Sequence, residues 1–164
     1  MKRRILSILS SMTVLTMITM CSSFNVNASE VEQKSIDGSI LTLDESSTGY
    51  STPSFARGEY LMTGESTISK AGLTRVYAYA ATTANREVNY IATLVYVEEY
   101  IEEEDAWGQV AWWAEETHND YYLSTAKSVK VDRGHYYRVR ANHIAGDQYP
   151  YDETASATDG IYLP

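Results

Sequence analysis

The feature that most constrains this chain is its division into short segments that alternate apolar and polar residues and end at turn residues. In residues 74–82, Val and Ala alternate with Arg and Tyr, and residues 135–144 place Tyr137, Val139 and Ala141 on one face of an extended strand. No stretch of about twelve residues has the 3.6-residue period of an amphipathic helix. Seven such segments, about ten residues apart, predict an all-β sandwich of about seven antiparallel strands.

The first 28 residues have the three parts of a secretory signal. Three basic residues precede an apolar run from Ile5 to Met20, and Val26-Asn27-Ala28 supplies the small residues of a cleavage site. A retained membrane anchor is one alternative, but the run is shorter than the roughly 20 residues that span a bilayer. A lipoprotein lipidated at Cys21 is the other, but Met20 stands where a small residue normally precedes such a cysteine. We therefore expect residues 1–28 to be removed as a signal peptide and the protein to be secreted, outside the cell or in its envelope.

Removal of this signal leaves 136 residues, enough for one domain, and changes the formal net charge from −9 to −12. It also removes Cys21, the chain's single cysteine, so no disulfide is expected to support the fold. The acidity argues against nucleic acid as a partner, because phosphates require a basic surface, and against an anionic membrane after signal removal.

Residues 29–57 are rich in Ser, Thr, Asp, Glu and Gly and have no sustained helical or strand period. This composition predicts a flexible leader, with an extra edge strand or short helix docked on the domain as the alternative. The β-sandwich domain is predicted over residues 58–164.

The segment from Val131 to Ala141 resembles the region between the fifth and sixth strands of fibronectin type III and immunoglobulin-like domains. There, as here with Val131 and Tyr137, a hydrophobic residue precedes by six a tyrosine that opens a strand. The resemblance implies an immunoglobulin/fibronectin type III-like sandwich in which the Tyr137 hydroxyl bonds to backbone just upstream. Arg133 departs from the pattern, because those domains usually carry proline at its position.

Five segments together are similar to a family of small, signal-peptide-bearing secreted proteins of Gram-positive bacteria, a family of unknown function. They are Arg57-Gly58, Ala81-Thr82-Thr83-Ala84, Val95–Glu99, Trp107–Trp113 and Gly134–His143. The resemblance implies a location outside the cell and a fold. It implies no catalytic residue.

The histidines do not have the spacing of a metal site or of a catalytic set. His118, His135 and His143 form neither HExxH nor HxH. His135 and His143 are predicted to flank the buried row of their strand, about 26 Å apart at the usual rise, which is too far to share a metal. Because the sequence also has no Gly-x-Ser-x-Gly elbow and no phosphate-binding glycine loop, we predict no catalytic residue, no metal ligand and no cofactor.

Six acidic residues lie between Glu98 and Asp105. The predicted structure is a solvated hairpin tip that keeps a sheet edge from aggregating. A calcium site and a carboxylate pair for glycoside hydrolysis are the alternatives.

Aromatic residues on the predicted strands are the best functional candidates. In residues 107–116 one face has no polar side chain before Glu116, so Trp112 is predicted in the core and Trp113 outward. The predicted ligand-binding residues are Trp113, Gln109, Tyr77, Tyr79 and Tyr136.

The sequence thus predicts a secreted, non-catalytic recognition or cell-envelope-associated module that binds an extracellular glycan or protein through an exposed aromatic sheet face. One alternative is a small secreted effector, either bacteriocin-like or an immunity partner. The other is a small extracellular hydrolase.

Overall fold

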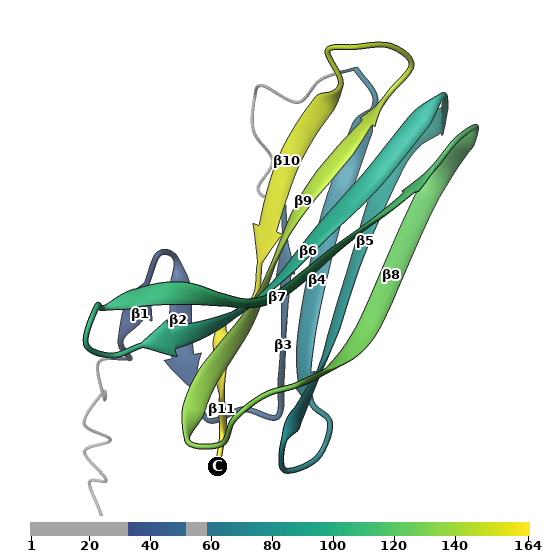
Figure 1. Cartoon of the computed structure of the whole chain (residues 1–164). Helices are drawn as coiled ribbons and strands as arrows, with labels where there is room; N and C mark the ends of the chain where they lie inside the picture. The colour runs from purple at the N-terminus through teal and green to yellow at the C-terminus, as the bar shows by residue number, and fades with distance from the viewer. Residues whose placement is uncertain (1–32, 52–58) are drawn as a thin grey trace, which may run out of the picture. The chain divides into compact units, whose positions relative to one another are not determined.

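The computed structural model describes residues 33–51 and 59–164 (Figure 1). This part of the chain consists of strands, turns and connecting loops, so the all-β prediction is confirmed. Within it there is no helix of the length and hydropathy needed to cross a membrane. The predicted signal peptide, residues 1–28, lies outside the described residues and stays a prediction.

The described residues form eleven strands. They are β1 (Ser35–Ile36), β2 (Ser39–Thr42), β3 (Ser46–Tyr50), β4 (Leu61–Lys70), β5 (Arg75–Val88), β6 (Tyr90–Ile101), β7 (Ala106–Thr117), β8 (Asp120–Lys130), β9 (His135–Gly146), β10 (Asp152–Ala157) and β11 (Gly160–Leu163).

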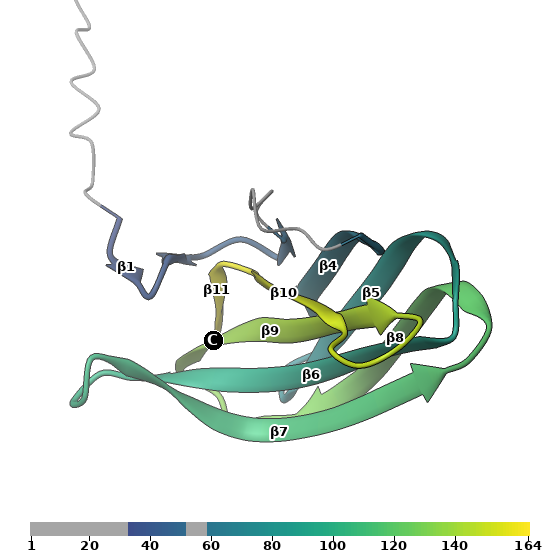
Figure 2. The ribbon, with the colours of Figure 1, turned by 90° about the horizontal axis from the view of Figure 1, so that it is seen from above.

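The strands form two sheets. The seven-stranded sheet has the order β1-β2-β11-β9-β6-β7, with β10 also paired to β9, and the four-stranded sheet has the order β3-β4-β5-β8. Figure 2 shows β4, β5 and β8 in one layer and β9, β6 and β7 in the other, which confirms the predicted sandwich. The strands of the predicted domain pair antiparallel with one another, and β11 also pairs in parallel with β2, with Gly160 opposite Leu41.

The prediction of a flexible leader is wrong for residues 35–50, which form β1, β2 and β3. Asp37 and Gly38 both have positive φ, at 49° and 77°, as the turn of a two-residue hairpin between β1 and β2 requires. β2 then extends the larger sheet beside β11, and β3 pairs with β4. The docked-strand alternative therefore holds, and the strand count exceeds seven partly for this reason.

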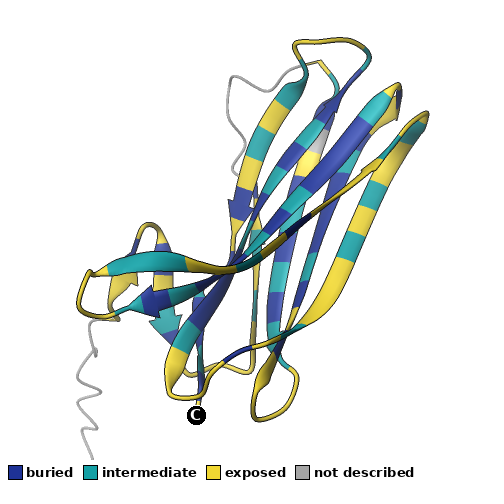
Figure 3. Ribbon diagram, in the orientation of Figure 1, coloured by how far each residue is buried: buried dark blue, intermediate teal, exposed yellow. Residues whose placement is uncertain are grey.

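The predicted buried row on β9 is confirmed: Tyr137, Val139 and Ala141 are all buried. His143, which was predicted to flank this row, is fully buried as well. Figure 3 shows the same alternation of burial along the inner strands. The Tyr137 hydroxyl donates to the backbone oxygen of Asp132 at 2.9 Å, as the resemblance implied. Burial, and next the Glu99 carboxylate, raise the pKa of this hydroxyl above its ordinary value.

The predicted orientation of the two adjacent tryptophans on β7 is wrong. Trp113 is only 6% exposed and packs in the core, whereas Trp112 is 60% exposed. A β-bulge explains part of the error: Glu98 is opposite Gln109 but Val97 is opposite Ala111, so the two sides of the bulge have shifted parity. The rest of the error arises because the outer face of β7 is also apolar here, so polarity does not distinguish it from the inner face.

Candidate functional site

The outer face of the four-stranded sheet is lined by tyrosines and hydroxyl-bearing side chains. Cross-strand register places Thr48, Thr67, Tyr79 and Ala126 in one row. The next row contains Ser46, Ser69, Tyr77 and Ser128, again one residue from each strand. We call the surface formed by these two rows, together with Ser124 and Tyr122 of β8, the tyrosine face.

Two tyrosines of this face hold each other in place. The hydroxyls of Tyr79 and Tyr122 lie 3.0 Å apart. They meet across the row that contains Ala81, which explains why Ala81 is buried although it points outward. Burial, and next the hydrogen bond to Tyr122, raise the pKa of Tyr79. Tyr77 is 40% exposed and presents its ring to solvent.

Polar contacts order the surroundings of these rings. The Thr48 and Thr67 hydroxyls are hydrogen-bonded at 2.9 Å, and Arg75 donates through Nε to the Ser128 hydroxyl at 2.8 Å. The rings offer apolar faces for stacking, and the hydroxyls can both donate and accept hydrogen bonds. The tyrosine face thus combines apolar ring surface with hydroxyl groups, and the row between Tyr79 and Tyr122 also contains Glu65.

The structure brings together only some of the predicted ligand-binding residues. Tyr77 and Tyr79 lie in neighbouring rows on the outer side of β5, which is the orientation that the alternation predicted. Trp113 is buried, with its indole donating to the Thr125 hydroxyl at 2.9 Å, so it cannot stack on a ligand. Gln109 and Tyr136 belong to the other sheet.

Tyr122 was missed at the sequence level, although a signal existed. Residues 122–128 alternate, with Tyr122, Ser124, Ala126 and Ser128 on one side. Register against β5 then places this side beside Tyr77 and Tyr79. The choice of β8 as the neighbour of β5 is a feature of the tertiary structure.

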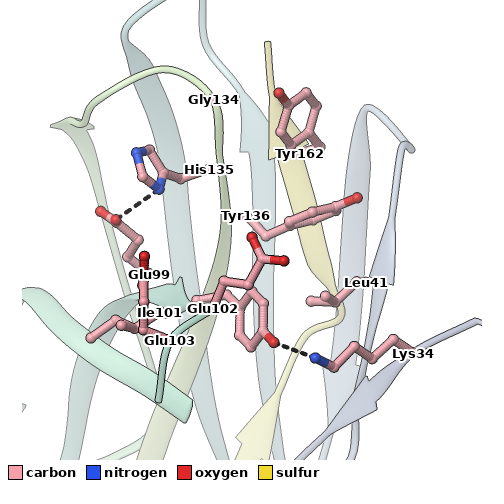
Figure 4. A pocket seen from close by; sticks show the side chains of 11 residues that line it. Lys34, Leu41, Glu99, Ile101, Glu102, Glu103, Gly134, His135, Tyr136 and Tyr162 are labelled. Atoms are coloured by element: carbon pink, nitrogen blue, oxygen red, sulfur yellow. Dashed lines mark hydrogen bonds and ion pairs between the residues drawn. The ribbon is translucent and has the colours of Figure 1, made fainter. Parts of the chain in front are cut away.

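Tyr136 lines a hollow of about 460 Å³ at one end of the seven-stranded sheet (Figure 4). Its ring packs against Tyr162, with 5.0 Å between the centroids. At the same hollow, the Glu99 carboxylate lies 3.0 Å from His135 Nδ1, and its other oxygen lies 3.0 Å from the Tyr137 hydroxyl, whose single hydrogen it shares with the Asp132 backbone oxygen. Both oxygens of Glu99 therefore hold the fold together, which leaves this carboxylate with little freedom for other chemistry.

Lys34 lies at the mouth of this hollow. Its ammonium group donates to the Tyr100 hydroxyl at 2.5 Å and lies 2.7 Å from an Asp105 carboxylate oxygen. The Asp105 carboxylate, and next the Tyr100 hydroxyl, raise the pKa of Lys34. These contacts attach the start of the described chain to the β6–β7 hairpin.

The acidic run from Glu98 to Asp105 does not act as one unit. Glu98 is buried and accepts from Arg138 at 2.8 Å and from Arg140 at 3.1 Å. Residues 102–105 form the exposed hairpin turn, as predicted. Among the described residues, no group of three or more His, Cys, Asp or Glu side chains is placed to hold a metal ion.

Arg138 is a buried arginine that contacts several strands and turns of the domain. It donates to Glu98, to the Ser39 hydroxyl and to the Asp37 carboxylate, and it lies 4.5 Å from the centroid of the Trp107 ring. The buried guanidinium thereby ties the β1–β2 hairpin to the seven-stranded sheet.

These observations define a β-sandwich domain with one hydroxyl-rich, aromatic outer face. Residues 34–160 match the family described as "Family of unknown function (DUF6147)", and the chain belongs to that family. The predicted membership of a family of unknown function is thus confirmed, while secretion, Gram-positive origin and the fibronectin type III or immunoglobulin pattern stay predictions. No curated protein and no solved structure shows a significant match to the chain.

Proposed function

We propose that this protein is a secreted, non-catalytic recognition module of the cell envelope that binds a neutral glycan through its tyrosine face. The observation that carries the proposal is the ring of Tyr77, exposed beside the hydroxyl-linked pair of Tyr79 and Tyr122. The Ser and Thr side chains of the tyrosine face lie in rows around these rings.

A glycan fits this chemistry better than a charged ligand does. Pyranose rings have an apolar face, which stacks on an aromatic ring, and an equatorial set of hydroxyls, which hydrogen-bond to Ser, Thr and Tyr. Tyrosine loses little conformational entropy on binding, because it has two side-chain torsions. The bond between Tyr79 and Tyr122 restricts these torsions before the ligand arrives, which lowers the entropic cost further.

The non-catalytic part of the proposal rests on how the reactive groups are used. Glu98 binds two arginines, Glu99 binds His135 and Tyr137, and His143 is buried between two hydroxyls. Each of these groups therefore has a structural partner. The envelope location rests on the N-terminal sequence pattern.

Co-sedimentation with isolated Gram-positive cell walls and with a panel of insoluble polysaccharides tests the proposal. We expect Tyr77→Ala to reduce the bound fraction at least about tenfold, as loss of one well-packed aromatic anchor does. Tyr149→Ala is the matched control, because Tyr149 is exposed on a loop away from this face. Both variants should keep the melting temperature of the parent.

Three results would count against glycan binding. The parent protein could fail to sediment with any of the walls or polysaccharides. Tyr77→Ala could sediment as well as Tyr149→Ala. Binding could also vanish after protease treatment of the walls, which would indicate a protein ligand in place of a glycan.

A further inference from the structure

A carboxylate lies among the tyrosines of the tyrosine face. Read across the four strands by register, the row of side chains directly beside Tyr79 is Tyr50, Glu65, Ala81 and Ser124. Glu65 is therefore the strand neighbour of Ala81, across which the hydroxyls of Tyr79 and Tyr122 meet. After burial and the contact with Tyr122, the negative charge of Glu65 is the next cause that raises the pKa of Tyr79. This carboxylate thus lies within electrostatic reach of the rings.

The charge of Glu65 has no partner within the part of the chain that the structure describes. No ion pair within that part includes Glu65, and its neighbour Tyr79 bonds to another tyrosine. Glu99, which is half-buried like Glu65, by contrast lies 3.0 Å from His135. Among the described residues, Glu65 is therefore a carboxylate of the tyrosine face that the fold itself does not use.

A carboxylate without a partner differs in one respect from the hydroxyls around it. A hydroxyl both donates and accepts hydrogen bonds, whereas an ionised carboxylate only accepts them, through two oxygens. Two neighbouring hydroxyls of a sugar can donate to these two oxygens together, and such charge-assisted bonds are roughly twice as strong as bonds between neutral groups. An ionised phosphodiester or carboxylate of a ligand has no hydrogen to donate and is repelled at the same place.

We infer that Glu65 determines the specificity of the tyrosine face: it accepts hydrogen bonds from two neighbouring hydroxyls of a neutral sugar and excludes anionic glycans. This role rests on the proposed function, because the same rings hold the ligand. Stacking alone does not select among glycans, since a tyrosine ring can pack against the apolar face of many sugars. Glu65 supplies the selection, because its charge favours hydroxyls over anionic substituents.

The cationic side chains that register places on this face are too far away to neutralise Glu65. Arg75 and Lys130 are opposite each other at the far end of β5 and β8. From Ala81 to Arg75 the strand rises by about 20 Å, which exceeds the Debye length of about 8 Å at physiological ionic strength. An anion about 4 Å from Glu65 is consequently repelled, and even in water-like surroundings this lowers its affinity at least about fivefold.

Co-sedimentation with one wall preparation in two forms tests this role. Isolated Gram-positive walls are used untreated and after hydrofluoric acid has removed their phosphodiester-linked anionic polymers. The parent chain should bind the treated walls at least about fivefold more tightly. Glu65→Gln removes the charge at nearly constant size, so it should lose most of this preference. Glu153→Gln is the matched control, because it removes the same charge from an exposed residue of the other sheet and should keep the preference.

Glu65→Ala tests the hydrogen bonds separately from the charge. It should bind the treated walls about tenfold more weakly than the parent, because both acceptor oxygens are gone. Glu65→Gln retains one acceptor oxygen, so its affinity should lie between those of the parent and the alanine variant. A melting temperature equal to that of the parent confirms that each variant is folded.

The outcomes separate this role from the glycan binding on which it depends. Equal preference in the parent and Glu65→Gln, or an equal change in Glu65→Gln and Glu153→Gln, overturns the role of Glu65 and leaves glycan binding standing. Glu65→Ala that binds the treated walls as tightly as the parent also overturns it. A parent chain that sediments with neither form of the walls overturns both proposals.

Discussion

Acidification should destabilise this domain through His143, which is buried and has no charged partner among residues 33–51 and 59–164. Thr82 Oγ1 lies 2.9 Å from Nδ1 and Ser156 Oγ lies 2.8 Å from Nε2, so neutral hydroxyls occupy both ring nitrogens. Burial lowers the pKa of His143 from 6.5 to about 4. The imidazole is consequently neutral in the folded protein over a pH range in which it is protonated in the unfolded chain.

The sign and size of the effect follow from proton linkage. Below pH 6.5 the unfolded chain binds a proton that the folded state does not bind, so stability falls as the pH falls. The loss continues until the pH reaches the folded pKa of about 4 and then levels off. The free energy of unfolding should drop by about 3 kcal/mol over this window, since one pKa unit corresponds to about 1.4 kcal/mol.

Urea unfolding at pH 7.5 and pH 4.5 measures this loss. Carboxylates also titrate in that range, so the variant His143→Gln serves as the reference: glutamine can bond to both hydroxyls and does not titrate. We expect the parent to lose about 2.5 kcal/mol more than the variant between the two pH values. Equal losses in the two proteins would refute the assignment of the buried histidine as neutral.

Two further predictions concern packing. Arg138→Ala leaves Glu98 buried without one of its partners and frees the β1–β2 hairpin, so urea unfolding should show a loss of about 3–5 kcal/mol; a loss below about 1 kcal/mol would contradict the network described above. Trp113→Ala should cost about 3–5 kcal/mol, whereas Trp112→Ala should leave the unfolding free energy nearly unchanged. If the two alanine variants have the same midpoint in thermal unfolding, the burial assigned to these tryptophans is wrong.

The alternation of residue types predicted burial correctly where one face of a strand is exposed to solvent and the other packs in the core. On β5 the buried Val76, Ala78 and Ala80 alternate with Arg75, Tyr77 and Tyr79, and on β9 Val139 and Ala141 flank Arg140, so alternation identified these buried residues correctly. The hydrogen bond of the Tyr137 hydroxyl could also be predicted from the sequence, because its backbone acceptor lies only five residues upstream.

The leader shows where local reasoning was incomplete. Asp37-Gly38, between Ile36 and Ile40, is a hairpin signal that the sequence does contain. The polar composition of residues 29–57 as a whole outweighed this signal. The pairing that stabilises β2 is with β11, more than a hundred residues away in the sequence. Composition carries no information about such a partner.

For this protein the sequence alone determined the all-β class, the buried rows of the inner strands and membership of a family without known function. Tertiary structure alone decided which tryptophan of β7 enters the core, since one extra residue in a bulge reverses the parity that alternation assumes. It also decided which tyrosines share a face. That depends on which strands are neighbours, and strand pairing is a long-range contact that no local period encodes.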